Sequence, residues 1–378
     1  MAINDDLHVP RRDLARQLAD RLTPDPFSGA SAGLFLAAPR RTGKSTFLRR
    51  DLMPVLEERG KLTIYVDLWS DRAADPGRLI AAAVAKAAAH HAGLTERVLG
   101  ALPFDAVSVG GVSVSLGETQ RAPATLSDAL AELARRARKD VVLIVDEAQH
   151  ALTSDAGMDA MYALKAARDA INQGNGEGRF WLILTGSHRD KLASLVMTAK
   201  APFYGGTVSD FPTLDRAYVD ALVPALNRRL AQDNQLDPED VMEAFVTLGR
   251  QPEKLLIVIR EHALGQEGSS GLRRTIRERA DVLRARAWEQ QESEFDQLDA
   301  VQRGVLRAMA QDGADFAPFA ASTRERIAAA LDRDEVTTTE VQRALEGLRD
   351  RQMIWRPSRG VYALETQDMR EWLLEKTA

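Results

Sequence analysis

The fold expected for this chain follows from one stretch near its start, which reads Gly33-Leu34-Phe35-Leu36-Ala37-Ala38-Pro39-Arg40-Arg41-Thr42-Gly43-Lys44-Ser45-Thr46. A short apolar run opens it, and a helical pattern follows from Thr46 to Glu58. The loop between them matches the pattern G-x-x-x-x-G-K-[ST], except that Ala38 stands at the first glycine position. Strand, glycine-containing loop and helix in this order predict a phosphate-binding loop.

The chemistry of that loop explains its spacing. Successive backbone N–H groups around Thr42, Gly43 and Lys44 would turn inward and form a nest for an anion, at the positive end of the following helix. The Lys44 ammonium would reach the β- and γ-phosphates of a nucleotide, and the Ser45 hydroxyl would ligate Mg²⁺. A side chain in place of Gly43 would block the phosphate, whereas the methyl group of Ala38 fits at a strand exit if φ stays negative.

Composition narrows the class of protein. The chain has 378 residues, enough for two or three domains, with 45% apolar and 28% charged residues and a net charge of −5. That charge argues against coating nucleic acid by charge alone. No apolar run approaches the ~20 residues that cross a bilayer, and residues 1–13 carry no secretory pattern. With no cysteine and no i,i+4 histidine pair, we expect a cytoplasmic protein without a membrane contact or a zinc site.

Strand and helix patterns alternate after the loop. Further strands are expected at 61–68, 141–147 and 179–187, and helices at 75–93, 126–139 and 158–172. The alternation predicts an α/β fold, a doubly wound parallel sheet of the P-loop NTPase type, over residues 1–212. A Gly-Gly hairpin near 104–118 reads as an insertion that either covers a sheet edge or contacts a partner.

Two strands of this sheet end in polar residues. Asp146 and Glu147 follow the aliphatic run 141–145, at the end of the strand where open α/β sheets place their ligands. Asp146 can hold Mg²⁺ through water, and Glu147 can orient the attacking water or accept its proton. Thr185 and Ser187 end the next strand, where they either hydrogen-bond the γ-phosphate or its water, or simply cap the strand.

The rest of the chain predicts two smaller domains. Residues 213–292 are helical throughout and read as a helical lid, and residues 293–378 show helices followed by a strand-turn-strand, a winged helix-turn-helix. In that tail a helix at 338–352 would enter the major groove of DNA, and the strand-turn-strand would contact the backbone. The arginines assigned to DNA are Arg343, Arg349, Arg351, Arg356 and Arg359. Against this, residues 294–378 hold 12 basic and 16 acidic side chains, so the tail can instead pack on its own core or recruit a protein.

Together these motifs resemble the archaeal-type P-loop ATPases of the AAA+/STAND group. The loop at 38–45 is similar to that family's G-P-R-R-x-G-K-[ST], the run Asp146-Glu147-Ala148-Gln149 to its D-E-x-Q, and residues 182–187 to its sensor-1 strand. The resemblance implies ATP and Mg²⁺ as cofactors and a winged-helix tail. It also implies that Pro252, in a G-x-P-like motif, nears the adenine, and that Arg11 belongs to a weakly matching N-terminal box.

One departure from the family limits what carries over. Family members often read Y-G-R where this chain has Tyr204-Gly205-Gly206, so no role of that arginine is transferred. Arg189 and Arg216 are nearby candidates, although each also reads as a surface residue. The D-E-A-Q stretch further resembles AAA+ ATPases of transposition systems.

We therefore expect a Mg²⁺-dependent, ATP-hydrolysing, nucleotide-driven switch that associates with DNA and assembles with itself when ATP binds. Catalysis is assigned to Lys44, Glu147, Thr185 and Ser187, and the metal to Ser45 and Asp146. Nucleotide binding is assigned to Arg11, Pro39, Arg40, Arg41, Thr42, Gly43, Lys44, Ser45, Thr46 and Pro252. The rival is a non-catalytic regulator that holds ATP as a structural ligand and recruits a protein partner; a kinase or transferase using the same loop is a third reading.

Overall fold

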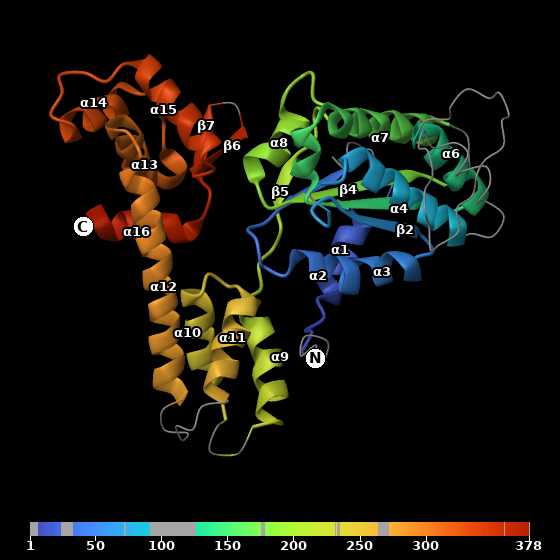
Figure 1. Ribbon diagram of the computed structural model, residues 1–378, viewed down its shortest axis with the longest axis horizontal. Helices are drawn as coiled ribbons and strands as arrows, with labels where there is room; N and C mark the ends of the chain where they lie inside the picture. Colours follow the sequence, from blue (N-terminus) through green and yellow to red (C-terminus); the bar gives the residue numbers. More distant parts are fainter. Residues whose placement is uncertain are drawn as a thin grey trace. The chain divides into compact units, whose positions relative to one another are not determined.

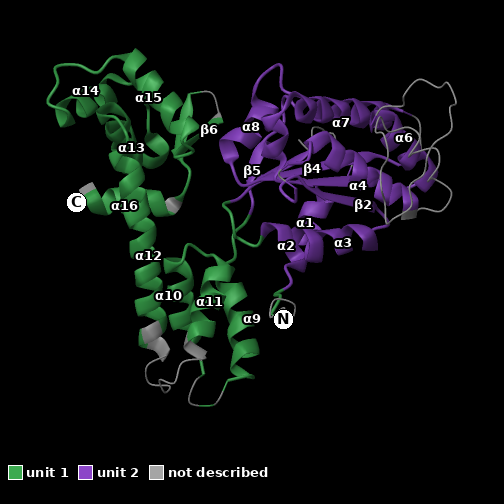
Figure 2. Ribbon diagram, viewed as in Figure 1, with its two compact units in different colours: residues 1–9, 39–43, 212–378 green, residues 10–38, 44–211 purple. Residues whose placement is uncertain are grey.

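The computed structural model describes residues 7–23, 33–71, 73–90, 126–174, 178–230, 232, 235–263, 272–358 and 360–377. The chain divides into two compact units, coloured separately in Figure 2. Unit 2 comprises residues 10–38 and 44–211, and unit 1 comprises residues 1–9, 39–43 and 212–378. Each unit is described by itself below. The hairpin expected near 104–118 lies outside the described residues.

Unit 2 is built on a parallel five-stranded sheet in the order β2-β3-β4-β1-β5. The strands are β1 (Leu34–Ala37), β2 (Leu62–Asp67), β3 (Val141–Asp146), β4 (Phe180–Gly186) and β5 (Val208–Asp210). The strand after β1 in sequence lies at the far edge of the sheet, so β3 and β4 stand between them. This order places the end of β1 beside the end of β4, and the end of β3 on the other side of β4.

Helices cover both faces of this sheet (Figure 1). The described helices of unit 2 are α1 (Arg12–Asp20), α2 (Lys44–Phe47), the π-helical turn η2 (Leu48–Leu52), α3 (Met53–Glu58), α4 (Pro76–His90), α6 (Leu126–Ala137), the 3₁₀ turn η3 (Ala148–Thr153), α7 (Asp155–Gln173) and α8 (Arg189–Met197). The segment from Lys44 to Glu58 is therefore helical throughout, with a π turn in its middle.

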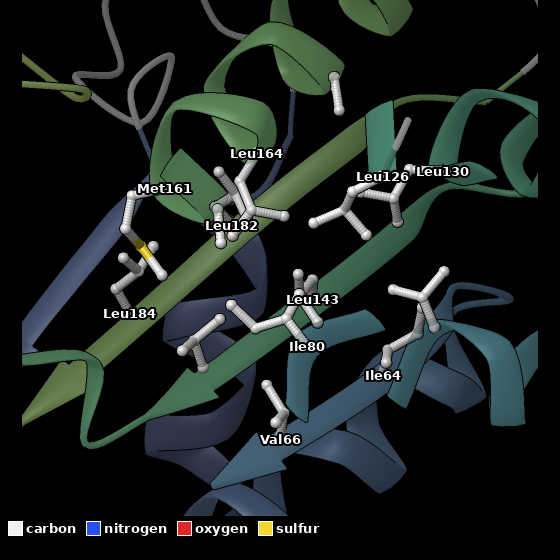
Figure 3. Packing of buried hydrophobic residues seen from close by; sticks show 14 of the residues in the cluster. Ile64, Val66, Ile80, Leu126, Leu130, Leu143, Met161, Leu164, Leu182 and Leu184 are labelled. Carbon is white, nitrogen blue, oxygen red and sulfur yellow. The ribbon is translucent and has the colours of Figure 1, made fainter. Parts of the chain in front are cut away.

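Successive side chains of each strand point to opposite faces of the sheet, so the sheet has one hydrophobic core on each face. Val141, Leu143 and Val145 of β3 face one cluster, whereas Val142 and Ile144 face the other, and all are fully buried. Figure 3 shows the first cluster, where Leu143 lies among side chains of the neighbouring strands and of the helices above them. Burial on both faces explains why this strand reads as an uninterrupted aliphatic run.

Unit 1 contains a group of four helices after the sheet. They are α9 (Arg216–Asn227), α10 (Pro238–Thr247), α11 (Pro252–Ala263) and α12 (Leu272–Asp296). Asp215 caps α9 and Asp237 caps α10, each accepting a backbone N–H of the first turn. The helices pack around a cluster that includes Val219, Phe245 and Leu255. The expected division between residues 292 and 293 falls within α12.

The C-terminal part of unit 1 has its own core. Its elements are α13 (Ala300–Asp312), the 3₁₀ turn η6 (Gly313–Asp315), α14 (Ala321–Ala330), α15 (Thr338–Asp350), β6 (Ile354–Ser358), β7 (Val361–Leu364) and α16 (Gln367–Thr377). The two strands form an antiparallel hairpin directly after α15. Helices followed by this hairpin are the arrangement of a winged helix, and the expected fold class is confirmed. Among the described residues, no helix has the length and apolarity needed to span a membrane.

The elements not expected from the sequence include β5, α8 and α16. The edge strand β5 has only three residues, too few for a pattern, and it exists because it pairs with β1. Helices α8 and α16 have weak amphipathic patterns, and tertiary packing against the sheet and against α13 stabilises them.

Candidate functional site

Polar residues gather where the parallel strands end. Asp146 is the last residue of β3 and pairs in register with Asp67, the last residue of β2. On the other side, Val145 pairs with Leu184 of β4, so Thr185 lies level with Asp146. The register of the sheet thus brings residues that are far apart in the sequence to a single edge, where α/β folds bind their ligands.

Lys44 is the centre of this cluster. Its Nζ lies 2.9 Å from Asp146 Oδ1 and 3.0 Å from Glu147 Oε1. The Lys44 side chain is only 5% exposed and that of Asp146 is fully buried. A buried ammonium is stable only with such partners, because each charge would otherwise pay a large desolvation cost.

Asp146 accepts several hydrogen bonds besides the contact with Lys44. Ser45 Oγ donates to Oδ2 at 2.6 Å, and Tyr65 donates its hydroxyl to the same oxygen at 3.0 Å. Thr185 Oγ1 donates to Oδ1, as does the backbone N–H of Glu147 at 3.0 Å. These donors fix both carboxylate oxygens in place.

The cluster holds its carboxylates ionised. Burial by itself raises the pKa of Asp146 and of Glu147, but the Lys44 charge and the hydrogen bonds outweigh burial, so both values lie below the ordinary ones. Asp67 behaves in the opposite way. Burial raises its pKa above 3.8, and the charges of Asp146 and Glu147 raise it further, against the backbone N–H of Trp69 and the Lys44 charge.

Glu147 also contacts Lys44 and has a left-handed backbone, with φ of 54°. Its Oε2 accepts a hydrogen bond from Ser187 Oγ at 2.7 Å and one from the side chain of Gln149. Left-handed φ is unfavourable for a residue with a side chain and is found at functional sites that the surrounding structure holds in place. Glu147 therefore contacts both Lys44 and Ser187, which are also assigned to catalysis. Thr185, the fourth of these residues, donates its hydroxyl to Asp146, which contacts Lys44.

The loop 39–43 belongs to unit 1 and is described there. Thr42 is buried and donates its hydroxyl to the carbonyl of Pro39 at 2.9 Å. Arg41 and Gly43 both have positive φ, 65° and 86°. Arg41 Nε lies 3.5 Å from Glu253 Oε2, next to the Pro252 that begins α11. Arg40 is exposed.

The remaining nucleotide-binding predictions fall in unit 2. Ser45 and Thr46 lie in the first turn of α2, and both are exposed. Arg11 stands at the N-cap of α1, with its guanidinium 5.6 Å from the ring centre of Phe47 and 5.2 Å from that of Phe211. Cation–π contacts of this kind hold the arginine over the aromatic pair.

Four residues of the site were not assigned from the sequence: Tyr65, Asp67, Gln149 and His188. Tyr65 and Asp67 are two residues apart on β2 and therefore share one face of the strand. The sequence signal that could have identified them is an apolar strand that ends in an acidic residue, as the Asp146 strand does. Gln149 belongs to the D-E-A-Q motif, which by itself assigns it no role. His188 directly follows Ser187, and nothing in its sequence context distinguishes it.

The arginines assigned to DNA lie on the winged helix. Arg343 is exposed on α15, Arg349 is half-buried in its last turn, and Arg351 is exposed just after it. On β6 the guanidinium of Arg356 lies 5.8 Å from the ring centre of Tyr362. Arg359 lies outside the described residues.

Two residues of the site suit a magnesium ion. Ser45 Oγ lies 2.6 Å from Asp146 Oδ2, so the two oxygens are close enough to bind the same ion. Mg²⁺ in nucleotide sites prefers one or two such oxygen ligands and takes the rest from phosphates and water. Among the described residues there is no group of three or more acidic or histidine side chains that would make an all-protein cage.

A parallel sheet in this order, with a lysine and an acidic pair at its carboxyl edge, defines a P-loop nucleoside triphosphatase fold. Residues 30–193 match the family model AAA_22, described as an AAA domain. No curated protein matches the chain.

Solved structures share the fold along nearly the whole chain. A Walker-type ATPase of Pyrococcus abyssi is 19% identical, with 96% of this chain and 95% of that one covered and a TM-score of 0.53. The ORC2 protein of Aeropyrum pernix in its ADP form is 16% identical, with 97% and 93% covered and a TM-score of 0.55. At these identities the likeness concerns the fold.

Proposed function

We propose that this protein binds ATP with Mg²⁺, hydrolyses it and acts as a nucleotide-driven switch. One observation carries the proposal: Lys44 Nζ contacts the carboxylates of Asp146 and Glu147 at 2.9 and 3.0 Å, while Ser45 bonds Asp146. A cation suited to phosphate, two oxygens suited to a metal and a carboxylate suited to a base therefore belong to one cluster.

Each residue of the cluster has a role in this proposal. Lys44 would exchange its carboxylate partners for phosphate oxygens and counter their charge. Ser45 and Asp146 would hold Mg²⁺, which neutralises charge on the phosphates when bound. Glu147 would orient the attacking water or take its proton, which its ionised state allows.

The other assigned residues would bind and position the nucleotide. Thr185 and Ser187 would hydrogen-bond the γ-phosphate or the water, from their places beside Asp146 and Glu147. Backbone N–H groups of the loop 39–46 would bind the phosphates. Arg11 and Pro252 would contact the adenosine, as the family resemblance implies.

Calorimetric titration with ATP and Mg²⁺, together with a hydrolysis assay, tests this function. We expect Lys44→Ala to abolish binding, and Glu147→Gln to keep binding while slowing turnover by about 10²- to 10⁴-fold. Lys86→Ala, on the exposed side of α4, is the control and should match the parent chain. Absence of binding heat in the parent chain would overturn the proposal, and parent-rate hydrolysis by Glu147→Gln would remove Glu147 as the base.

The winged helix is proposed to associate with duplex DNA. Two acidic residues of α15 are engaged by partners on α15 or beside it. Glu340 pairs with Arg333 at 2.8 Å, and Glu346 accepts a hydrogen bond from Gln342 at 2.7 Å. Arg343 is exposed on the same helix, which supports a phosphate contact there.

A second candidate is a non-catalytic regulator that holds ATP and recruits a protein through the winged helix. The observation in its favour is Gly206, the position at which relatives often have arginine. A Cβ there would lie 2.8 Å from Phe35 Cε2 and 3.1 Å from Val196 Cγ1, so a side chain at this position would require its neighbours to shift. Single-turnover hydrolysis with and without duplex DNA separates the two, because the regulator hydrolyses nothing in either case. Size measurement with and without ATP tests self-assembly.

A further inference from the structure

The two carboxylate oxygens of Glu147 are held by different groups. Oε1 accepts the Lys44 ammonium at 3.0 Å, whereas Oε2 accepts the Ser187 hydroxyl at 2.7 Å and the Gln149 amide. When Lys44 turns to phosphate in the proposed function, Oε1 loses its partner and Oε2 keeps both of its own. The Oε2 side therefore determines where Glu147 points during the reaction.

Gln149 and His188 extend this support beyond the residues assigned from the sequence. Gln149 is 3% exposed, and its Nε2 lies 3.1 Å from Ser187 Oγ and 3.3 Å from His188 Nδ1. His188 Nδ1 also lies 3.2 Å from Ser187 Oγ. Glu147, Gln149, Ser187 and His188 thus form a closed polar group, which we name the Glu147 clamp.

The donors of the clamp can be counted. Ser187 has one hydroxyl hydrogen and gives it to Glu147. Gln149 has two amide hydrogens, and one goes to Glu147. The other can go to His188 Nδ1, provided that the ring carries its hydrogen on Nε2. In this tautomer His188 accepts a hydrogen bond from Gln149, and Ser187 and Gln149 each direct one hydrogen at Glu147 Oε2. The 3.2 Å contact between Ser187 Oγ and His188 Nδ1 then carries no hydrogen.

The orientation of the Gln149 amide leaves one buried oxygen without a hydrogen bond from the described residues, which indicates that its N–H groups are needed where they lie. Its Oε1 is buried and has no hydrogen-bond partner among the described residues. A flipped amide would place that oxygen against the Glu147 carboxylate and repel it. A Cβ on Gly186 would come within 2.5 Å of the same oxygen, so a side chain there would require the Gln149 amide to move. An unsatisfied buried acceptor is unusual in a native fold and indicates that the amide is held for its N–H groups.

We propose that Gln149 and His188 are positioning residues that hold Glu147 Oε2, so that Oε1 is the atom presented to the attacking water. This inference rests on the proposed hydrolysis of ATP. Neither residue contacts the nucleotide; both act through Glu147 and Ser187. Loss of either support lets the carboxylate rotate about its side-chain torsions once Lys44 has left, and the fraction of productively oriented base falls.

The experiment compares turnover with nucleotide affinity in four variants. Gln149→Leu keeps the volume but removes the donors, and His188→Phe removes the acceptor. We expect each to lower kcat by about 10- to 100-fold, the effect seen when residues that orient metal ligands are lost, with an unchanged Kd for ATP. His188→Asn, whose side-chain oxygen can accept near the position of Nδ1, should restore most of the activity. Gln290→Leu, on the exposed side of α12, is the matched control.

A double substitution separates positioning from general damage. In a Glu147→Gln background, Gln149→Leu should have no further effect on kcat, because the group it positions is already absent. Parent-like kcat in both Gln149→Leu and His188→Phe would overturn the inference while leaving the proposed function standing. Equal loss in His188→Asn and His188→Phe would also overturn it. A parent chain that hydrolyses no ATP would instead contradict the proposed function itself.

Discussion

Tyr65 donates its hydroxyl to Asp146 Oδ2 at 3.0 Å, from the neighbouring parallel strand. Burial raises the pKa of Tyr65, and the charge of Asp146 raises it further, so the phenol stays a donor throughout the physiological range. The contact gives Asp146 a donor that no motif contains.

Tyr65→Phe removes that donor and leaves the ring in place. A hydrogen bond to a charged group contributes about 1.5–3 kcal/mol, so we expect the free energy of unfolding to fall by an amount in this range. Urea unfolding measures it. Tyr162→Phe on α7 is the control, because it removes only an exposed hydrogen bond from the Tyr162 hydroxyl to the Lys200 carbonyl. A loss no larger than that of Tyr162→Phe would contradict the role given to the contact.

Lys44→Met tests how the charges of the site affect stability. The substitution leaves two carboxylates without their cation, and breaking such a buried pair costs about 3–5 kcal/mol. In the parent chain the pKa values of Asp146 and Glu147 are lowered, so their contribution is present above about pH 4.5 and is lost as the pH falls through the lowered values.

Without Lys44, burial is no longer outweighed and should raise the pKa of Asp146. The variant then binds a proton on folding and gains stability as the pH falls. We expect the difference in unfolding free energy between Lys44→Met and the parent to be largest near pH 7 and to shrink towards pH 4. Chemical unfolding at several pH values measures it, and a difference independent of pH would argue against the charge pairing.

Gly206→Ala tests how tightly the structure packs around Gly206. The added methyl would lie 2.8 Å from Phe35 Cε2, a contact that forces the ring or the loop to move. Overpacking of this kind costs about 1–3 kcal/mol. Thermal unfolding should show a lower Tm for Gly206→Ala. Tyr204→Ala, at a side chain that is 63% exposed two residues earlier, should change it little. An unchanged Tm in Gly206→Ala would show that the position accepts a side chain.

The capping box of α15 has a predictable dependence on pH. Glu340 accepts the backbone N–H of Thr337 and the guanidinium of Arg333, which lower its pKa to about 2. A lowered pKa means that the ionised side chain stabilises the fold above about pH 4.5 and loses this effect as the pH falls towards 2.

Glu340→Gln should therefore be less stable than the parent at pH 7, and the two should converge as the pH approaches 2. Chemical unfolding across this range measures the difference. Thr337→Ala, which removes the other half of the box, should cost about 1 kcal/mol at pH 7. A gap between Glu340→Gln and the parent that persists at pH 2 would rule out the ionised carboxylate as its cause.

Arg343→Ala tests the proposed DNA contact. If Arg343 touches a phosphate, the slope of log K against log salt should decrease in magnitude by about 1, and binding should weaken equally for different sequences. Fluorescence anisotropy with a labelled duplex at several salt concentrations measures both. Arg274→Ala, on the exposed face of α12, is the control for loss of one positive charge. An identical slope in Arg343→Ala and the parent would remove this contact.

Local sequence patterns determined much of this protein. The aliphatic run of β3 gave a buried strand because both of its faces pack, and the glycine and lysine of the loop 38–45 predicted a phosphate site from chemistry alone. Asp146 and Glu147 were assigned because acidic residues follow that strand directly. Thr337 and Glu340 formed a capping box at the predicted start of α15.

Only the tertiary structure decided the rest. Tyr65 and Asp67 reached the site because β2 pairs in register with β3, and no local pattern encodes which strands are neighbours. Gln149 and His188 met because the chain after β3 and the chain after β4 pass close together at one edge of the sheet. Sequence specifies residue types and periodicity over short distances, whereas strand order and side-chain geometry arise from the packing of segments that are 39 residues apart for Gln149 and His188 and 81 apart for Tyr65 and Asp146.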